Sequence, residues 1–217
     1  MDNLERIAES IRSQLEAKNA ARDQALARSR ALIRHCANTI KAVHRAEWDD
    51  AQASLQSMRE ITKEMLDGVR DHPDLYEAGY LQDALKEVSE ACILYAIIRG
   101  EDWPTQETLQ VSPGAYLNGM AEAASELRRT ILDIIRQDHT GEAERLLDSM
   151  DSIYNALMTF DYPDAITGGL RHRVDALRAV LERTRGDLTN SLRQQKLQAA
   201  LSKLEGQLKI DESQSNS

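Results

Sequence analysis

Apolar residues recur at three- and four-residue spacing along most of the chain. One such stripe runs through residues 116–131, at Tyr116, Leu117, Met120, Ala124, Leu127 and Ile131. Another runs through 85–98, at Leu85, Val88, Ala91, Cys92, Tyr95 and Ile98. This spacing is typical of a helix with one buried face. No stretch alternates apolar and polar residues long enough to indicate a strand. The pattern therefore predicts an all-α protein.

Helix start and stop signals divide the chain into seven predicted helices. Their approximate ranges are 4–44, 50–69, 74–99, 113–138, 140–160, 164–185 and 188–208. Ser112 as the N-cap and Pro113 in the first turn start the fourth helix. The pair Gly168-Gly169 lies inside the sixth, and Gly186-Asp187 predicts a turn before the last. The polar end 211–217 predicts a disordered tail, so we expect one helical domain over 1–210.

The charge balance restricts how the protein binds a polyanion. The net charge is −9, from 36 acidic and 27 basic residues. A protein with this balance does not bind nucleic acid or a membrane surface through its overall charge, so a phosphate-binding surface requires a local concentration of basic residues. The first predicted helix offers one, around Arg22, Arg30 and Arg34. Ordinary salt bridges around a solvated helix are the alternative.

The cysteines and the apolar runs indicate the compartment. Cys36 and Cys92 lie in apolar stripes without metal-ligand spacing. They are expected to be free buried thiols, which suits a reducing cytoplasm. The first residues have neither the basic nor the apolar region of a signal peptide, and the longest apolar run, 91–98, is too short to cross a membrane.

Two pairs of carboxylates stand at helical spacing. Glu122 and Glu126 are four residues apart, and Glu87 and Glu90 are three apart, so each pair shares a face of its helix. If the two helices pack together, four carboxylates converge. Several anionic oxygens at one point are what a hard divalent cation requires. A solvated acidic helix face is the alternative, because the chain is rich in acidic residues.

The run from Ala115 to Arg129, AYLNGMAEAASELRR, resembles the D-Y-L-x-G-x-x-x-x-x-x-E-L-x-R run of the translin/TRAX family. The chain length, the helix order and the stretch 141–158 extend the resemblance over nearly the whole chain except the tail. The resemblance implies a seven-helix translin-like bundle with long antiparallel helices. It also implies a homo-oligomer, a hollow octamer, that binds single-stranded RNA or DNA.

The resemblance also assigns the carboxylates. TRAX-type subunits are Mg²⁺-dependent endoribonucleases with an E-x-x-E pair on one helix and a D-x-x-x-E pair on the next. Glu87 and Glu90 match the first pair, and Glu122 and Glu126 match the second with Glu in place of Asp. The resemblance thus implies that these four residues are catalytic and hold Mg²⁺ or Mn²⁺.

The chain departs from the family pattern at three places. Ala115 replaces the leading Asp of the motif. Glu122 lengthens one ligand arm by a methylene, which shifts a bound metal by about 1 Å. The Arg- and His-rich segment that translin uses for nucleic acid is replaced by Glu77-Ala-Gly-Tyr80. We therefore assign nucleic-acid binding to Arg22, Arg30 and Arg34.

The sequence leaves three functions open. The first is a metal-dependent endoribonuclease acting on single-stranded RNA inside a hollow oligomer. The second is a non-catalytic single-stranded RNA- or DNA-binding protein of the translin type. The third is a structural helical assembly protein whose carboxylates are merely solvated. The first is the hypothesis that we carry forward.

Overall fold

The computed structural model describes residues 3–137 and 140–215, and all regular structure in this part is helical. The helices are α1 (Asn3–His44), α2 (Trp48–Gly68), α3 (Pro73–Tyr76), α4 (Gly79–Arg99), α5 (Gln106–Leu109), α6 (Pro113–Ile135), α7 (Thr140–Leu157), α8 (Asp164–Thr167) and α9 (Leu170–Ser215). The predicted all-α fold is confirmed. No helix in the described ranges is both long and apolar enough to cross a membrane.

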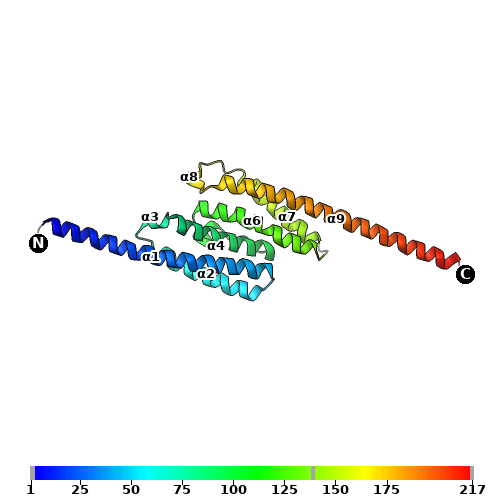
Figure 1. Cartoon of the computed structure of the whole chain (residues 1–217), viewed down its shortest axis with the longest axis horizontal. Coiled ribbons are helices and arrows are strands. Elements are labelled where there is room, and N and C mark those ends of the chain that lie inside the picture. The colour runs from blue at the N-terminus through cyan, green and yellow to red at the C-terminus, as the bar shows by residue number, and fades with distance from the viewer. Residues whose placement is uncertain (1–2, 138–139, 216–217) are drawn as a thin grey trace.

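Helix α4 lies at the centre of the bundle. It packs against α1 on one side and α6 on the other, while α2 covers α1, and α7 and α9 pack on α6 (Figure 1). Residues 88–97 of α4 are all buried, because neighbouring helices cover it on nearly every side. Its sequence around Glu90 is apolar for this reason, and Glu90 is itself buried.

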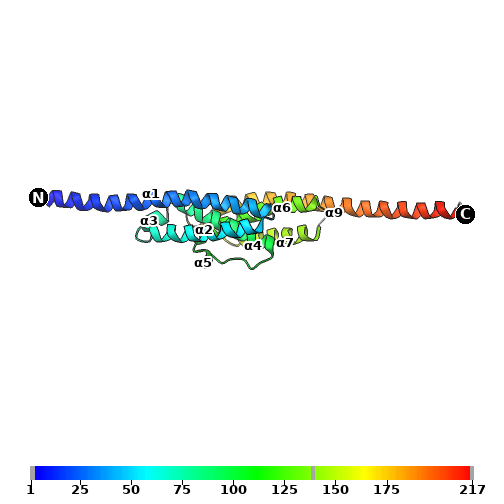
Figure 2. The ribbon, with the colours of Figure 1, turned by 90° about the horizontal axis from the view of Figure 1, so that it is seen from below.

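Two helix ends extend beyond the bundle. The N-terminal part of α1 projects at one end of the molecule, and the C-terminal part of α9 projects at the opposite end (Figures 1 and 2). Both ends keep their large apolar side chains exposed to solvent. These are Leu4, Ile7, Ile11 and Leu15 on α1, and Leu197, Leu201 and Leu204 on α9.

Several helix boundaries differ from the predicted ones. The predicted helix 74–99 is broken at Ala78, whose extended ψ of 135° separates α3 from α4. Gly168 and Gly169 break the sixth predicted helix, because their φ angles of 62° and 82° are left-handed and glycine adopts them without strain. The dozen-residue loop after α4 holds the short helix α5.

The predicted turn at Gly186-Asp187 is wrong, since α9 continues through it. Asp187 forms a salt bridge of 2.8 Å with Arg128 of α6, and Thr184 is buried beside it. Packing on α6 offsets the cost of one helical glycine, about 1 kcal/mol. The last two predicted helices are therefore one, and the described residues form six long helices where seven were predicted.

The predicted start of the fourth helix is confirmed, whereas the predicted C-terminal tail is not. Ser112 caps α6, accepting a bond from the Ala115 amide at 3.1 Å. The predicted end of the fourth helix, at 138, lies outside the described residues. Helix α9 is helical as far as Ser215, where an irregular tail was expected, and 216–217 lie outside the described part. The division into a domain over 1–210 and a tail stays a prediction.

Both thiols are free and buried, as predicted. Burial raises the pKa of Cys92 to about 12 and raises that of Cys36 further still. Neither thiol is therefore ionised at neutral pH, and both serve as apolar packing groups.

Candidate carboxylate centre

Helices α4 and α6 come into very close contact at Gly119. A Cβ atom at this position would lie 2.5 Å from the carbonyl oxygen of Lys86 and 2.9 Å from the amide nitrogen of Glu90. Only glycine permits this approach, because any side chain would collide with backbone atoms. The backbone that carries Glu87 and Glu90 is thus held beside the turn that precedes Glu122.

Three of the four predicted carboxylates converge at this contact. One oxygen from each of Glu87, Glu90 and Glu122 lies within 4.8 Å of the others. Glu90 is buried, whereas Glu87 and Glu122 are half-buried. Burial, followed by the charges of Glu87 and Glu122, raises the pKa of Glu90 to about 8. We call Glu87, Glu90 and Glu122 the carboxylate centre.

Two basic side chains bind the carboxylate centre. The Nε atom of Arg173, on α9, donates to Glu122 Oε1 at 2.8 Å. The ammonium of Lys86 donates to Glu122 Oε2 and lies 2.9 Å from Glu87 Oε1. Burial opposes the ionisation of Glu122, but the bonds from Lys86 and Arg173 outweigh it and hold the pKa of Glu122 below its usual value.

The fourth carboxylate, Glu126, is not among the three oxygens within 4.8 Å and binds a histidine instead. His44 Nε2 lies 3.0 Å from Glu126 Oε2, and His44 Nδ1 lies 3.1 Å from Thr130 Oγ1. The His44 side chain is only 1% exposed. Its bond to Glu126 outweighs burial and lowers the pKa of that carboxyl. Glu126 is therefore an ionised neighbour of the carboxylate centre with a fixed orientation.

The residues present fit a hard divalent cation. Magnesium binds oxygen at about 2.1 Å, so ligands on opposite sides of the ion lie about 4.2 Å apart, and oxygens within 4.8 Å need only small shifts. Within the described residues no hydrogen bond reaches the Glu90 carboxylate. Glu87, Glu122 and Glu126 carry one negative charge more than Lys86 and Arg173 balance, and ionisation of Glu90 adds a second. One divalent ion would balance this charge.

Comparisons with known proteins place this chain in a family. No family profile matches the chain. It is 30% identical over 191 residues to the uncharacterized protein MJ0175 of Methanocaldococcus jannaschii, covering 87% of this chain and 84% of that protein. The structure of AfC3PO superposes with a TM-score of 0.79 at 34% identity, covering 85% of this chain and 96% of that one. The chain belongs to the translin/C3PO family. The predicted family is therefore confirmed.

Two further solved structures agree with this assignment. AfC3PO in a complex with duplex RNA gives the same TM-score of 0.79 and covers 95% of that chain. Apo-NeC3PO, which is 19% identical, gives a TM-score of 0.75 and covers 88% of this chain and 98% of that one. At that identity the likeness to NeC3PO concerns the fold alone.

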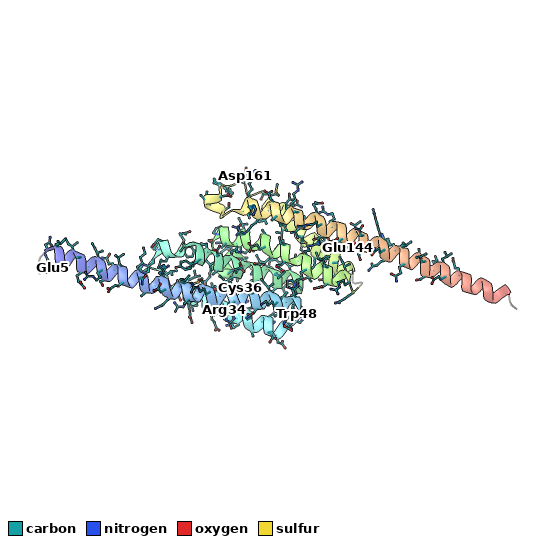
Figure 3. The ribbon with its side chains drawn as sticks, in the orientation of Figure 1. Glu5, Arg34, Cys36, Trp48, Glu144 and Asp161 are labelled. Atoms are coloured by element: carbon teal, nitrogen blue, oxygen red, sulfur yellow. The ribbon has the colours of Figure 1, made fainter. Side chains whose placement is uncertain are left out.

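The arginines predicted to contact nucleic acid lie outside the carboxylate centre of this translin/C3PO protein. All three are exposed on α1, and Arg22 pairs with Asp23 at 2.9 Å. At about 100° per residue, Arg22 and Arg30 lie on the side of α1 that carries His44. Arg34 lies on the side opposite Cys36, away from α4 (Figure 3). The structure does not test a phosphate contact, so this role stays a prediction.

Three residues that bind these carboxylates, Lys86, Arg173 and His44, were not predicted from the sequence. Lys86 stands four residues before Glu90, and this spacing places both side chains on one face of the helix. The sequence therefore contained a local signal for Lys86. Arg173 comes from a helix 51 residues after Glu122, and no local pattern connects the two. His44 lies on α1, 82 residues before Glu126, and its side chain is buried against α6.

Proposed function

We propose that this chain is a metal-dependent endoribonuclease that acts on single-stranded RNA inside a hollow oligomer. The observation that carries the proposal is the convergence of Glu87, Glu90 and Glu122 within 4.8 Å in a member of the translin/C3PO family. Binding to RNA is supported by AfC3PO, which is known in a complex with duplex RNA. The preference for single strands comes from the family resemblance in the sequence.

The chain's own residues supply the remaining chemistry. The carboxylate centre would hold Mg²⁺ or Mn²⁺, which when bound lowers the pKa of water and stabilises charge on a phosphate. Glu126 is ionised and oriented by His44, so it suits the role of a base that accepts a proton from water. Arg173 keeps Glu122 in place through its bond to Oε1.

The positively charged surface needed for RNA is local. Arg22 and Arg30 lie on the His44 side of α1, where a strand entering the carboxylate centre would pass. An enclosed cavity concentrates such a local field, which permits binding to a polyanion in spite of the net charge of −9. The free buried thiols support the proposed cytoplasmic location.

Cleavage of labelled RNA tests the nuclease proposal. Single-stranded and duplex RNA are each incubated with Mg²⁺, Mn²⁺ or EDTA, and binding is recorded on the same samples. Glu90→Gln and Glu122→Gln should each lose cleavage by about 100-fold or more, the low end for a lost catalytic group, while RNA binding persists. Glu60→Gln, an exposed residue of α2, is the matched control. Equal cleavage by all four proteins would refute the proposed active site.

A non-catalytic RNA-binding protein is the second candidate. It is favoured by one observation, that both oxygens of Glu122 already bind basic side chains, Arg173 and Lys86. This candidate predicts binding that weakens with salt and no cleavage in Mg²⁺ or Mn²⁺ by any variant. The same experiment thus separates the two functions.

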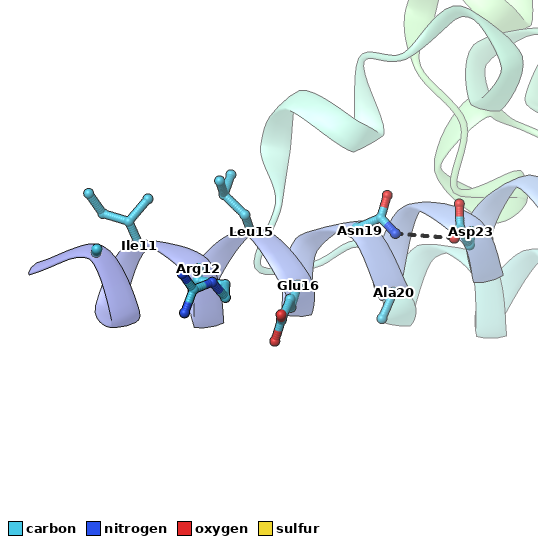
Figure 4. A pocket seen from close by; sticks show the side chains of 8 residues that line it. Ile11, Arg12, Leu15, Glu16, Asn19, Ala20 and Asp23 are labelled. Atoms are coloured by element: carbon cyan, nitrogen blue, oxygen red, sulfur yellow. Dashed lines mark hydrogen bonds between the residues drawn. The ribbon is translucent and has the colours of Figure 1, made fainter. Parts of the chain in front are cut away.

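The two projecting helix ends support the proposed homo-oligomer, an octamer by the family resemblance. A groove along α1 is lined by Ala8, Ile11, Leu15 and Ala20 with Arg12, Glu16, Asn19 and Asp23 (Figure 4). The exposed leucines of α9 are accompanied by Arg193, Lys196 and Lys203 and by one acid, Glu205. Each projecting end thus leaves an exposed apolar stripe that a helix of another copy would cover, with charges of both signs beside it on α1 and mostly basic ones on α9. We infer that α9 of one copy covers α1 of the next.

A further inference from the structure

Lys86 occupies an unusual place for a lysine. Its ammonium binds Glu87 Oε1 at 2.9 Å on its own helix and Glu122 Oε2 on α6. Only 13% of its side chain is exposed. It therefore lies among the same oxygens that a divalent cation would bind, and it supplies a positive charge there.

The two oxygens of Glu122 bind partners that differ in how rigidly they are fixed. Arg173 binds Oε1 and is itself anchored, because its Nη1 donates to Asn118 Oδ1 and to the Gly168 carbonyl oxygen, each at 3.1 Å. Among the described residues, the hydrogen bonds and ion pairs of the Lys86 ammonium all go to carboxylates of the centre. A lysine side chain is also a flexible stem with a single charged end. Of the two, Lys86 is the one that can leave.

A divalent ion and the Lys86 ammonium compete for one oxygen. Lys86 binds Oε2 of Glu122 and Arg173 binds Oε1, so an ion that enters between the carboxylates approaches an oxygen that already carries the Lys86 ammonium. An ammonium and a metal ion bound to the same oxygen would also repel each other across a few ångströms in a half-buried site. Binding of the ion therefore opposes the two Lys86 ion pairs.

We propose that Lys86 is an internal counter-cation that competes with the divalent ion and so sets the metal concentration at which the carboxylate centre fills. It balances Glu87 and Glu122 in the metal-free protein and moves toward solvent when the ion binds. This inference rests on the metal site of the proposed function, but not on cleavage. It makes Lys86 a regulator of the site rather than a metal ligand.

The test is the affinity of the full chain for Mn²⁺, measured by titration calorimetry without RNA. Lys86→Met keeps the stem and removes the charge, so it should bind Mn²⁺ about tenfold more tightly, within the range found for groups around metal ligands. Lys86→Arg should bind Mn²⁺ more weakly than wild type, because a guanidinium holds two carboxylates more firmly. Lys63→Met, on an exposed position of α2, is the control and should leave the affinity unchanged.

The opposite signs separate competition from a structural role. If Lys86 only supported the fold, both substitutions would weaken Mn²⁺ binding or leave it unchanged, and either result with Lys86→Met overturns the proposal. Absence of Mn²⁺ binding by wild type would overturn it as well. If wild type binds Mn²⁺ with the predicted order of affinities but cleaves no RNA, the nuclease function fails while the competition stands.

Discussion

At the scale of single residues, Glu90 is where burial and charge conflict most. Its pKa is raised from the ordinary 4.5 to about 8, first by burial and then by Glu87 and Glu122. Between about pH 4.5 and pH 8 the folded protein therefore keeps a proton on Glu90 that the unfolded chain has already released. Stability associated with this carboxyl is present below that window and is lost as pH rises through it.

This conflict predicts a pH-dependent gain in stability for Glu90→Gln. The neutral amide removes the cost of ionisation, so in EDTA the variant should melt several degrees above wild type at pH 8.5 and near wild type at pH 5. About 2–4 °C per kcal/mol is expected for a chain of this size. Thermal melts at the two pH values check this, with Glu60→Gln as the exposed control. The same difference in Tm at both pH values would show that ionisation of Glu90 is not the cause.

His44 makes a second residue-scale prediction. His44→Leu leaves Glu126 and Thr130 without their shared partner, which should lower the free energy of unfolding by about 1–3 kcal/mol. Urea unfolding of wild type, His44→Leu and the exposed control His172→Leu measures the loss. A loss no larger than that of the control would mean that the contact contributes nothing to stability.

At the scale of helices, the contact of α4 with α6 at Gly119 controls the carboxylate centre. Gly119→Ala places a methyl 2.5 Å from the carbonyl oxygen of Lys86, so the two helices must separate. Forced packing of this kind costs about 1–3 kcal/mol, and it should also weaken Mn²⁺ binding by moving Glu90 away from Glu122. The control, Gly186→Ala in α9, meets no atom within 4 Å and should instead stabilise the helix by up to about 1 kcal/mol. Urea unfolding and calorimetry of both variants measure these effects.

The helices show which parts of the fold could be predicted from the sequence. Periodicity and capping predicted the long helices, because a buried face and a cap such as Ser112 are local features. Gly168 and Gly186 have the same side chain, yet Gly168 ends α8 with a left-handed φ, whereas α9 continues through Gly186 on the support of α6. Contacts with other helices decide whether a helix ends or continues at such a glycine, and residue spacing along the chain does not predict those contacts.

The carboxylate centre, too, could be predicted only in part from the sequence. Spacing placed Glu87 with Glu90 and Glu122 with Glu126, and the family resemblance brought the pairs together. No single-helix pattern could show that His44 would bind Glu126. Nor could one show that Lys86 and Arg173 would bind the two oxygens of Glu122. Such contacts join helices that are distant in sequence.

At the scale of the whole molecule, the exposed apolar stripes of α1 and α9 lie at opposite ends (Figure 2). If α9 of one copy covers α1 of the next, the contact is between two different surfaces, and repeating it closes a ring or extends a fibre. Leu15→Glu on α1, or Leu201→Glu on α9, places a charge in this contact. Each variant alone should therefore remain a monomer, while wild type should form the proposed closed oligomer.

Mixing the two variants distinguishes the pairing of unlike ends from the pairing of like ends. Leu15→Glu keeps an intact α9 and Leu201→Glu keeps an intact α1, so an equal mixture should form dimers and nothing larger. If α1 paired with α1 and α9 with α9, each variant alone would already be a dimer through its intact end. Light scattering behind size-exclusion chromatography measures the masses, and Ile166→Glu, exposed on α8, is the control that should assemble like wild type. Full-size oligomers from either arm variant would show that these stripes are not the contact, because a buried unpaired carboxylate costs several kcal/mol at each interface.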